Sequence, residues 1–225
     1  MIEIENLKKT YKQGSLKVKA VDNVSLKISD GEFTAIVGPS GSGKTTLLNC
    51  IGGLDNPTSG KVIIDGEIIS SYSSGQMINF RLNNIGFVFQ AYNLIPVLTA
   101  KENIEMVMLM QGYNKQDMDQ RSSDLLSEVG MADMSKRRPA ELSGGQQQRV
   151  AVARALASKP KFILADEPTA NLDSKSTAKL LDIMSKLNKQ ENITFVFSTH
   201  DQRVIDRARR VVTLEDGKII KDIKK

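Results

Sequence analysis

The sequence predicts an α/β fold built on a largely parallel sheet, and two observations lead to this prediction. Four short, continuous apolar runs have the length and composition of strands that are buried on both faces of a sheet: FTAIV, IGFVF, KFILA and ITFVFS. Helical patterns lie between these runs. The clearest covers residues 174–188 behind a cap at Asp173, with apolar residues at helical spacing: Leu180, Leu181, Met184 and Leu187. Strands that alternate with helices are typical of a parallel sheet, which binds its ligands at the carboxyl ends of the strands.

The remaining elements follow in chain order. VSLKIS, at residues 24–29, alternates like a half-buried strand, and the N-terminal strands are expected to be antiparallel. Residues 102–130 are rich in Met and Gln, which indicates a helical lobe, and VVTLEDGKIIKDIKK predicts a hairpin around Asp216 and Gly217. We therefore expect a single domain, residues 1–225. Residues 1–90 and 160–225 would form its β and catalytic core, and residues 91–159 its helical lobe.

Composition excludes several classes of protein. With 225 residues, 40% hydrophobic and 25% charged, the chain can bury a sizeable core. No segment approaches the roughly 18 consecutive apolar residues of a membrane span, and no secretory signal is evident. The single cysteine, Cys50, excludes an intrachain disulfide. The net charge of +5 is mild, and the basic clusters at residues 136–138 and 207–210 lack interleaved aromatic residues, so no nucleic-acid partner is expected.

The segment FTAIVGPSGSGKTTLLNC contains the phosphate-binding pattern G-x-x-x-x-G-K-[ST] between an apolar strand and a helix. The glycines allow the backbone to wrap a phosphate, while Lys44 would contact the β- and γ-phosphates and Thr45 would bind Mg²⁺. The whole loop is therefore expected to bind a nucleotide: Gly38, Pro39, Ser40, Gly41, Ser42, Gly43, Lys44, Thr45 and Thr46.

Polar residues follow three other predicted strands. KFILADEPTANLD places Asp166 where it could hold Mg²⁺ through water, and Glu167 where it could polarise a water that attacks the γ-phosphate. His200 is the last residue of ITFVFSTH, and Gln90 comes directly after IGFVF. A lone histidine is more often structural, and a polar residue after a strand is common. At this edge of a nucleotide-binding sheet, however, the histidine would reach the γ-phosphate, whereas only the whole set of motifs gives Gln90 a functional role.

A second glycine-rich stretch, LSGGQQQR at residues 142–149, precedes the predicted helix GQQQRVAVARALAS. The amino-terminal dipole and free amides of such a helix favour an anion, and glycines permit close approach of the backbone. A single domain that already has one phosphate loop has no evident use for another.

The order of these motifs resembles that of the nucleotide-binding subunits of ATP-binding cassette (ABC) transporters. GPSGSGKT, FVFQ, LSGGQ, ILADEP, NLD and STH occur in the order of that family and at its approximate spacings, and LSGGQ is the most discriminating of them. FVFQAYNLIPVLTAKEN and ADEPTANLDS resemble the branch of lipoprotein-release and macrolide-export transporters. The resemblance implies a P-loop NTPase fold of the ABC type, with a RecA-like parallel-sheet core, an N-terminal antiparallel β subdomain and a helical subdomain.

The resemblance also implies roles for individual residues. Tyr11 would stack on adenine, although it could equally pack at a strand edge. Gln90 would join Thr45 and Asp166 at the Mg²⁺ ion, and Asp173 would lie in the loop that links the two sites of a dimer. The catalytic residues would be Glu167, His200, Lys44 and Gln90. The ATP on one P-loop would be contacted by four residues of a second, identical chain, in an ATP-dependent homodimer: Ser143, Gly144, Gly145 and Gln146.

The implied activity is hydrolysis of ATP that drives export, or extraction of a lipid-anchored substrate, by separate integral membrane permease subunits. The chain would then be cytoplasmic and peripheral on the inner face of the cell membrane. The permease contact would be AYNLIPVLT, residues 91–99, from Ala91 at its start to Thr99 at its end, unless these residues pack the helical lobe onto the sheet. A soluble ABC-type ATPase of DNA repair or chromosome organisation is disfavoured, because only about fifty residues without sustained heptads separate Gln90 from Ser143. A translation-associated factor is also disfavoured, since such factors usually carry two cassettes.

Overall fold

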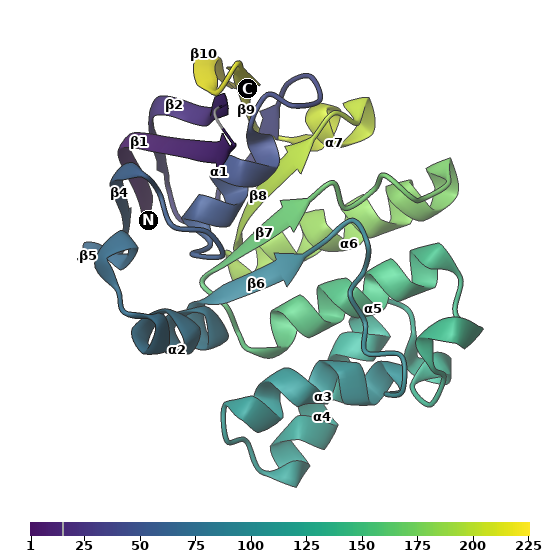
Figure 1. Ribbon diagram of the computed structural model, residues 1–225. Coiled ribbons are helices and arrows are strands. Elements are labelled where there is room, and N and C mark those ends of the chain that lie inside the picture. Colours follow the sequence, from purple (N-terminus) through teal and green to yellow (C-terminus); the bar gives the residue numbers. More distant parts are fainter. Residues whose placement is uncertain (15) are drawn as a thin grey trace.

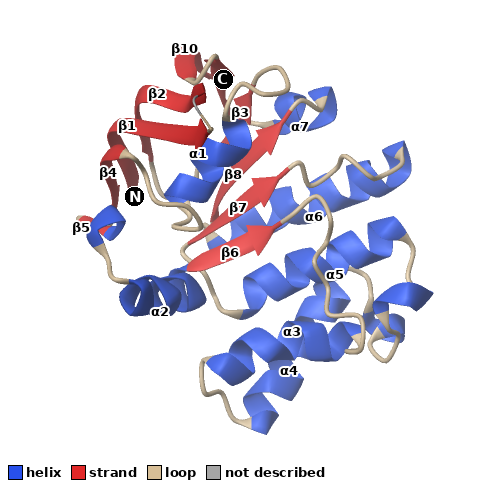
Figure 2. Ribbon diagram, in the orientation of Figure 1, coloured by secondary structure: helices blue, strands red, loops and turns tan. Residues whose placement is uncertain are grey.

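The computed structural model describes residues 1–14 and 16–225, whose strands form two sheets (Figures 1 and 2). The first sheet is antiparallel, in the order β2-β1-β4-β5, and the second has the order β10-β9-β3-β8-β7-β6. The strands of the first are β1 (Ile2–Gln13), β2 (Leu16–Ile28), β4 (Ser59–Ile64) and β5 (Glu67–Ile68). Those of the second are β3 (Phe33–Val37), β6 (Ile85–Val88), β7 (Phe162–Asp166), β8 (Thr194–Thr199), β9 (Arg210–Glu215) and β10 (Lys218–Lys224).

The predicted α/β class is confirmed. The four apolar runs correspond to β3, β6, β7 and β8, which pair in parallel, and β9 adds a further parallel strand beside β3. The expected C-terminal hairpin is also present, because β10 returns antiparallel to β9 after a turn at Asp216 and Gly217. Both turn residues have positive φ, +46° and +75°, as a tight hairpin turn requires.

The α-helices of the described ranges are α1 (Lys44–Ile51), α2 (Ser74–Asn84), α3 (Ala100–Met110), α4 (Lys115–Glu128), α5 (Gly144–Ala157), α6 (Ser174–Glu191) and α7 (Gln202–Arg207). Helices α3 to α7 lie between strands of the second sheet, whereas α1 and α2 each lie between a strand of one sheet and a strand of the other. The cap predicted for α6 is confirmed, since the Asp173 carboxylate accepts the backbone N–H groups of Lys175 and Ser176 at 2.9 Å. The helical stretch at residues 102–130 divides into α3 and α4 at a turn in which Gly112 has a φ of +82°. Figure 1 shows α3, α4 and α5 grouped together below β6.

Two hydrophobic cores lie on opposite faces of the second sheet, because the side chains of a strand alternate between its faces. On β8, Val196 belongs to the core that contains Leu47 of α1 and the inner face of the first sheet. Its neighbours Phe195 and Phe197 belong to the other core, formed with α3 to α6. With both faces covered, the polar residues that follow β3, β6, β7 and β8 gather at one edge of the sheet. Within the described ranges, none of the helices combines the length and apolar character needed to cross a membrane.

Candidate active site

The loop that connects β3 to α1 lies between β2 and β9, and two of its glycines, Gly38 and Gly43, have no room for a side chain. A Cβ at Gly38 would lie 2.0 Å from the carbonyl oxygen of Leu214. Gly43 has a φ of +100°, and a Cβ there would lie 2.0 Å from the carbonyl oxygen of Ala20. Close backbone approach therefore requires glycine at both positions.

The C-terminal hairpin also supports this loop. The N–H of Gly217 donates to the carbonyl of Ser42 at 3.0 Å, and the carbonyl of Gly217 accepts the N–H of Asp22 at 2.8 Å. The turn between β9 and β10 thus ties the phosphate loop to β2. Nothing in the sequence pattern of the hairpin indicates this role, because it depends on long-range packing.

The end of the loop has the features of an anion site. Helix α1 begins at Lys44, its N-cap Gly43 provides no capping side chain, and its first turn contains no acidic residue. Its first amides and its dipole are therefore free to act on an anion such as a phosphate. The Lys44 ammonium is nearly buried and lies 2.9 Å from the carbonyl oxygens of Gly38 and Pro39, so a positive charge is held inside the loop.

The oxygens next to the loop fit a magnesium ion. The Thr45 hydroxyl donates to Asp166 Oδ1 at 3.0 Å, which joins the first turn of α1 to the end of β7. Across residues 1–14 and 16–225, no group of three or more His, Cys, Asp or Glu side chains could form a metal cage. A single carboxylate and a hydroxyl suit Mg²⁺, which keeps several waters and takes the remaining ligands from substrate phosphates. Bound there, Mg²⁺ would neutralise charge on the β- and γ-phosphates.

Glu167 and His200 lie side by side because they follow adjacent parallel strands, with Asp166 of β7 opposite Ser198 of β8. The Nδ1 atom of His200 is 2.8 Å from Oε1 of Glu167. The backbone of Glu167 is in the left-handed region, with a φ of +45°, and its N–H donates to the carbonyl of Ser198 at 2.8 Å. This conformation is unfavourable for a residue with a Cβ and is typical of functional sites, where the surrounding structure holds it in place.

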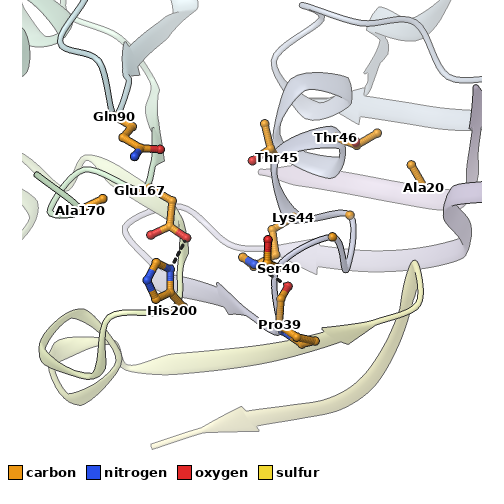
Figure 3. Close-up of a pocket in the computed structure, with 12 residues that line it drawn as sticks. Ala20, Pro39, Ser40, Lys44, Thr45, Thr46, Gln90, Glu167, Ala170 and His200 are labelled. Carbon is orange, nitrogen blue, oxygen red and sulfur yellow. Dashed lines mark hydrogen bonds and ion pairs between the residues drawn. The ribbon is translucent and has the colours of Figure 1, made fainter.

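Lys44, Thr45, Glu167 and His200 line one cleft of about 660 Å³, whereas Asp166 is not among its lining residues. Figure 3 shows Lys44 and Thr45 on one side of it, and Gln90, Glu167 and His200 on the other. Its lining residues are Ala20, Pro39, Ser40, Gly41, Gly43, Lys44, Thr45, Thr46, Gln90, Glu167, Ala170 and His200. Two of them, Ala20 and Ala170, were not indicated by the sequence, because an alanine gives no chemical signal of its own. The structure therefore brings together the four residues expected to be catalytic.

Tyr11 lies on β1 and is not among the residues that line the cleft. Its hydroxyl donates to Asp55 at 2.6 Å, and the Lys9 ammonium lies 4.9 Å from the centroid of its ring. Partial burial and the Asp55 carboxylate raise the pKa of the Tyr11 hydroxyl. The ring is 40% exposed, so it retains surface that another flat group could contact.

The second glycine-rich stretch forms the start of α5. The Ser143 hydroxyl accepts the N–H of Gln146, and the Gln146 side chain accepts the N–H of Ser143 at 2.8 Å, so the two residues form a capping box. The helix begins at Gly144, one residue earlier than the sequence suggested, and the two glycines occupy its first turn. None of residues 143–146 lines the cleft of the same chain. One chain by itself therefore does not place its two glycine-rich stretches on one ligand.

Comparison with known proteins decides the family. Residues 21–170 match the family model described as ABC transporter. The chain belongs to the ABC transporter family. It is an ATP-binding subunit with ATPase activity that uses ATP and Mg²⁺, as expected from the motifs.

Relatives of this ABC transporter subunit support the narrower branch. The lipoprotein-releasing system ATP-binding protein LolD of Syntrophus aciditrophicus is 43% identical over 220 residues, which cover 98% of this chain and 99% of LolD. The macrolide export ATP-binding/permease protein MacB of Syntrophobacter fumaroxidans is 43% identical over 97% of this chain and 31% of MacB. Resemblance to the LolD- and MacB-type proteins is confirmed.

Solved structures confirm the fold. A dimeric structure of the ATP-binding cassette MJ0796, in a post-hydrolysis state bound to ADP and Pi, matches with a TM-score of 0.93 and 42% identity. The match covers 100% of this chain and 98% of that chain. MJ0796, an ABC transporter ATP-binding protein of Methanocaldococcus jannaschii, is 45% identical over 228 residues in the sequence comparison, covering 100% of this chain and 97% of MJ0796.

In this cassette, residues 91–99 form an irregular segment between β6 and α3, as expected. Leu94 packs partly against the core of α3 to α6, and Asn103 holds Ile95 by accepting its N–H at 2.7 Å. Val97, by contrast, is 71% exposed. The segment thus has one side packed on the helices and another facing outward.

An apolar groove of about 450 Å³ adjoins this segment, between α2, α3 and the amino-terminal part of β6. Ile78 and Met110 line the groove and are 55% and 60% exposed. Its other lining residues include Leu54, Phe87, Phe89, Asn93, Val107 and Arg154. Large exposed apolar side chains around a groove indicate an interaction surface.

Proposed function

We propose that two copies of this chain close head to tail around two Mg-ATP molecules and open after hydrolysis. Each nucleotide would lie between the Lys44 loop of one chain and Ser143, Gly144 and Gly145 of the other. The observation that carries this proposal is the position of residues 143–146, which we call the signature. They cap α5 at an exposed Ser143, without an acidic residue in the first turn, yet they do not line the cleft of their own chain. The dimer of MJ0796, bound to ADP and Pi, supports such an assembly.

Within each site, the geometry supports the following roles. Lys44 would hold the β- and γ-phosphates, while Thr45, Asp166 and Gln90 would hold Mg²⁺. Glu167 would polarise the attacking water, and His200, which is bonded to it, would fix the γ-phosphate. The remaining expected contacts are those of the loop, with Tyr11 on the adenine and Gln146 at the start of the partner's α5. All of these residues would act within one domain, residues 1–225, whose helical lobe spans about residues 91–159.

A variant that hydrolyses ATP slowly tests whether the closed dimer forms. In Glu167→Gln the amide cannot accept the proton of water, so Mg-ATP should accumulate unhydrolysed. Multi-angle light scattering of this variant at saturating Mg-ATP is expected to show the mass of a dimer. Glu167→Gln combined with Ser143→Arg is the matched control. It should bind Mg-ATP in single chains and remain monomeric, because the exposed arginine blocks the partner's nucleotide. A Glu167→Gln variant that binds Mg-ATP and remains monomeric would contradict the proposal.

The membrane partner is proposed to dock in the apolar groove beside residues 91–99. A permease would present a short apolar segment to Ile78 and Met110, and this contact would place the chain at the inner face of the cell membrane. Arg154 of α5 lines the groove and donates to the carbonyl of Tyr92 at 2.9 Å. A movement of residues 91–99 would therefore be transmitted to α5, the helix that follows Ser143. Closure and opening would in this way drive export, or extraction of a lipid-anchored substrate, as the names of MacB and LolD suggest.

The groove can be tested by placing a photo-crosslinking amino acid at Met110 and, as a control, at Ile220. Both side chains are about equally exposed, 60% and 58%, but Ile220 lies on β10, away from the groove. Crosslinking in intact cells should join position 110, and not position 220, to an integral membrane protein. Adducts only with soluble proteins at position 110 would contradict the proposal. A role in DNA repair is not favoured, since α3, α4 and short turns, rather than a long coiled coil, occupy the chain between Gln90 and Ser143.

A further inference from the structure

Thr199 is the last residue of β8 and is fully buried beside the proposed catalytic carboxylate. Its hydroxyl lies 3.3 Å from Oε2 of Glu167 and accepts the backbone N–H of Asp201 at 3.0 Å. Because the N–H of Asp201 occupies a lone pair of the hydroxyl, the hydroxyl hydrogen remains available to the carboxylate. Thr199 therefore joins the turn after β8 to the carboxylate after β7.

The turn that carries Asp201 is itself firmly held. The Asp201 carboxylate accepts the hydroxyl of Thr169 at 2.7 Å and the guanidinium of Arg203 at 2.7 Å. Thr169 is buried and lies two residues beyond Glu167, so Asp201 also fixes the backbone that follows the catalytic carboxylate. The bonds from Arg203 outweigh the opposing effect of partial burial and hold the pKa of Asp201 at about 2, so this anchor stays ionised at neutral pH.

The two oxygens of Glu167 thus have different partners. Oε1 is bonded to His200, whose side chain is 71% exposed, while Oε2 faces the buried hydroxyl of Thr199. In the proposed mechanism His200 also contacts the γ-phosphate, so it cannot serve Glu167 alone. When His200 turns to the phosphate, Thr199 remains as the donor that fixes the direction of the carboxylate.

We propose that Thr199 is a positioning residue for ATP hydrolysis, which holds the Glu167 carboxylate in line with the attacking water and is itself held by the N–H of Asp201. This inference rests on the proposed role of Glu167. A general base must lie within hydrogen-bond reach of the water in the correct direction, and a displacement of about 1 Å can cost roughly a hundredfold in rate. Loss of the hydroxyl should therefore lower kcat and leave nucleotide binding unchanged.

The test compares Thr199→Val, which keeps the shape and removes the hydroxyl, with Thr199→Ser, which keeps the hydroxyl and removes a methyl group. Thr194→Val is the matched control. Thr194 lies at the other end of β8, is also buried, and accepts a backbone N–H, that of Gly31 at 2.8 Å, but lies away from Glu167. We expect Thr199→Val to lower kcat by about 10- to 100-fold with KM for Mg-ATP within about twofold. Thr199→Ser should restore most of kcat, and Thr194→Val should keep it.

Nucleotide affinity and Mg-ATP-dependent dimerisation in the Glu167→Gln background show whether each variant is folded. The inference is overturned if folded Thr199→Val retains kcat within about twofold of the parent, or if Thr199→Ser is as slow as Thr199→Val. It is also overturned if Thr194→Val is equally slow, since the effect would then belong to the strand rather than to the hydroxyl. Substantial turnover by Glu167→Gln itself would instead remove the proposed role of Glu167, so failure of the proposed function is distinguishable from failure of this inference.

Discussion

Replacement of Arg210 by methionine should destabilise the fold strongly, because this one side chain joins both sheets. Arg210 begins β9 and is 7% exposed. Its guanidinium donates to Glu32 at 2.9 Å, to the carbonyl of Lys27 in β2 at 2.6 Å, and to both oxygens of Asp222 in β10 at 2.8 Å. Methionine keeps much of the length of the side chain and removes the charge and all of these donors.

The magnitude follows from the partners that would be left behind. Removal of one member of a buried ion pair costs about 3 to 5 kcal/mol, because the other charge stays buried without compensation. Glu32 is 15% exposed, whereas Asp222 is 37% exposed and water would partly replace its lost partner. We therefore expect a loss of about 3 kcal/mol in the free energy of unfolding, at the lower end of that range. For a chain of this size, this corresponds to a decrease of roughly 6 to 12 °C in Tm.

The pH dependence gives a second measure of the same network. Burial alone would raise the pKa of Glu32, but the hydrogen bonds of Arg210 and of the Ser29 backbone hold it below its ordinary value. Hydrogen bonds from Arg210 likewise hold the pKa of Asp222 low, against partial burial. A carboxylate with a lowered folded-state pKa stabilises the fold above its unfolded pKa, and this contribution is lost as the pH falls through the folded value. The difference in stability between parent and Arg210→Met should therefore be full above about pH 5 and shrink progressively below about pH 4.5.

Thermal unfolding by circular dichroism between pH 3 and pH 8 would test both expectations. Lys224→Met is the matched control, because the Lys224 ammonium also lies near Glu32, at 3.5 Å, but is 70% exposed. Exposed pairs contribute only about 0 to 1 kcal/mol, so this variant should change Tm by less than about 4 °C. An Arg210→Met protein as stable as Lys224→Met, or a difference from the parent that does not change with pH, would refute the reasoning.

Two further outcomes follow from the loops. Gly43→Ala should destabilise the fold by about 2 to 4 kcal/mol and abolish Mg-ATP binding, because its Cβ would meet the carbonyl of Ala20. Gly41 has a φ of +80° and nothing within 4 Å of its Cβ position, so Gly41→Ala should lose only about 1 kcal/mol. Denaturant titration and nucleotide binding would measure both effects. Asp201→Asn should lower stability by about 1 to 2 kcal/mol at pH 7. Since bonds from Arg203 lower the pKa of Asp201 to about 2, this difference should be complete above about pH 4 and disappear as the pH falls toward 2. A constant difference across that range would contradict the assignment.

The parts of the fold that sequence patterns predicted are those governed by local rules. The strands β3, β7 and β8 are continuous apolar runs because both faces of the second sheet are covered. The start of α6 was evident because the cap at Asp173 acts on the residues that immediately follow it. Asp166, Glu167 and His200 could be placed near one another because parallel strands end at one edge of a sheet, whichever residues pair between them.

What the patterns did not indicate depends on contacts between distant segments. The support of the phosphate loop by Gly217 comes from a hairpin that lies far from it in the sequence. The ring of Tyr11 is engaged by Lys9 and Asp55, an arrangement that depends on how β1 lies against the loop before β4. Thr199 belongs to the STH motif, but the proximity of its hydroxyl to Glu167 follows only from the register of β7 and β8 and from the left-handed backbone of Glu167. A pattern of residue types contains neither register nor backbone angles.

The structure also changes how the glycines of the signature should be tested. A Cβ at Gly144 would lie 2.7 Å from the hydroxyl of Tyr92, and one at Gly145 would lie 2.7 Å from the hydroxyl of Ser176. Gly145 is therefore needed for packing within its own chain, and a Cβ at Gly144 would displace the end of the Tyr92 side chain, whether or not a partner's phosphate approaches them. Loss of activity in a glycine variant would fit either reason. Ser143 is exposed and its hydroxyl accepts the N–H of Gln146 at the start of its own helix, so an arginine there distinguishes a site shared between two chains from a helix cap.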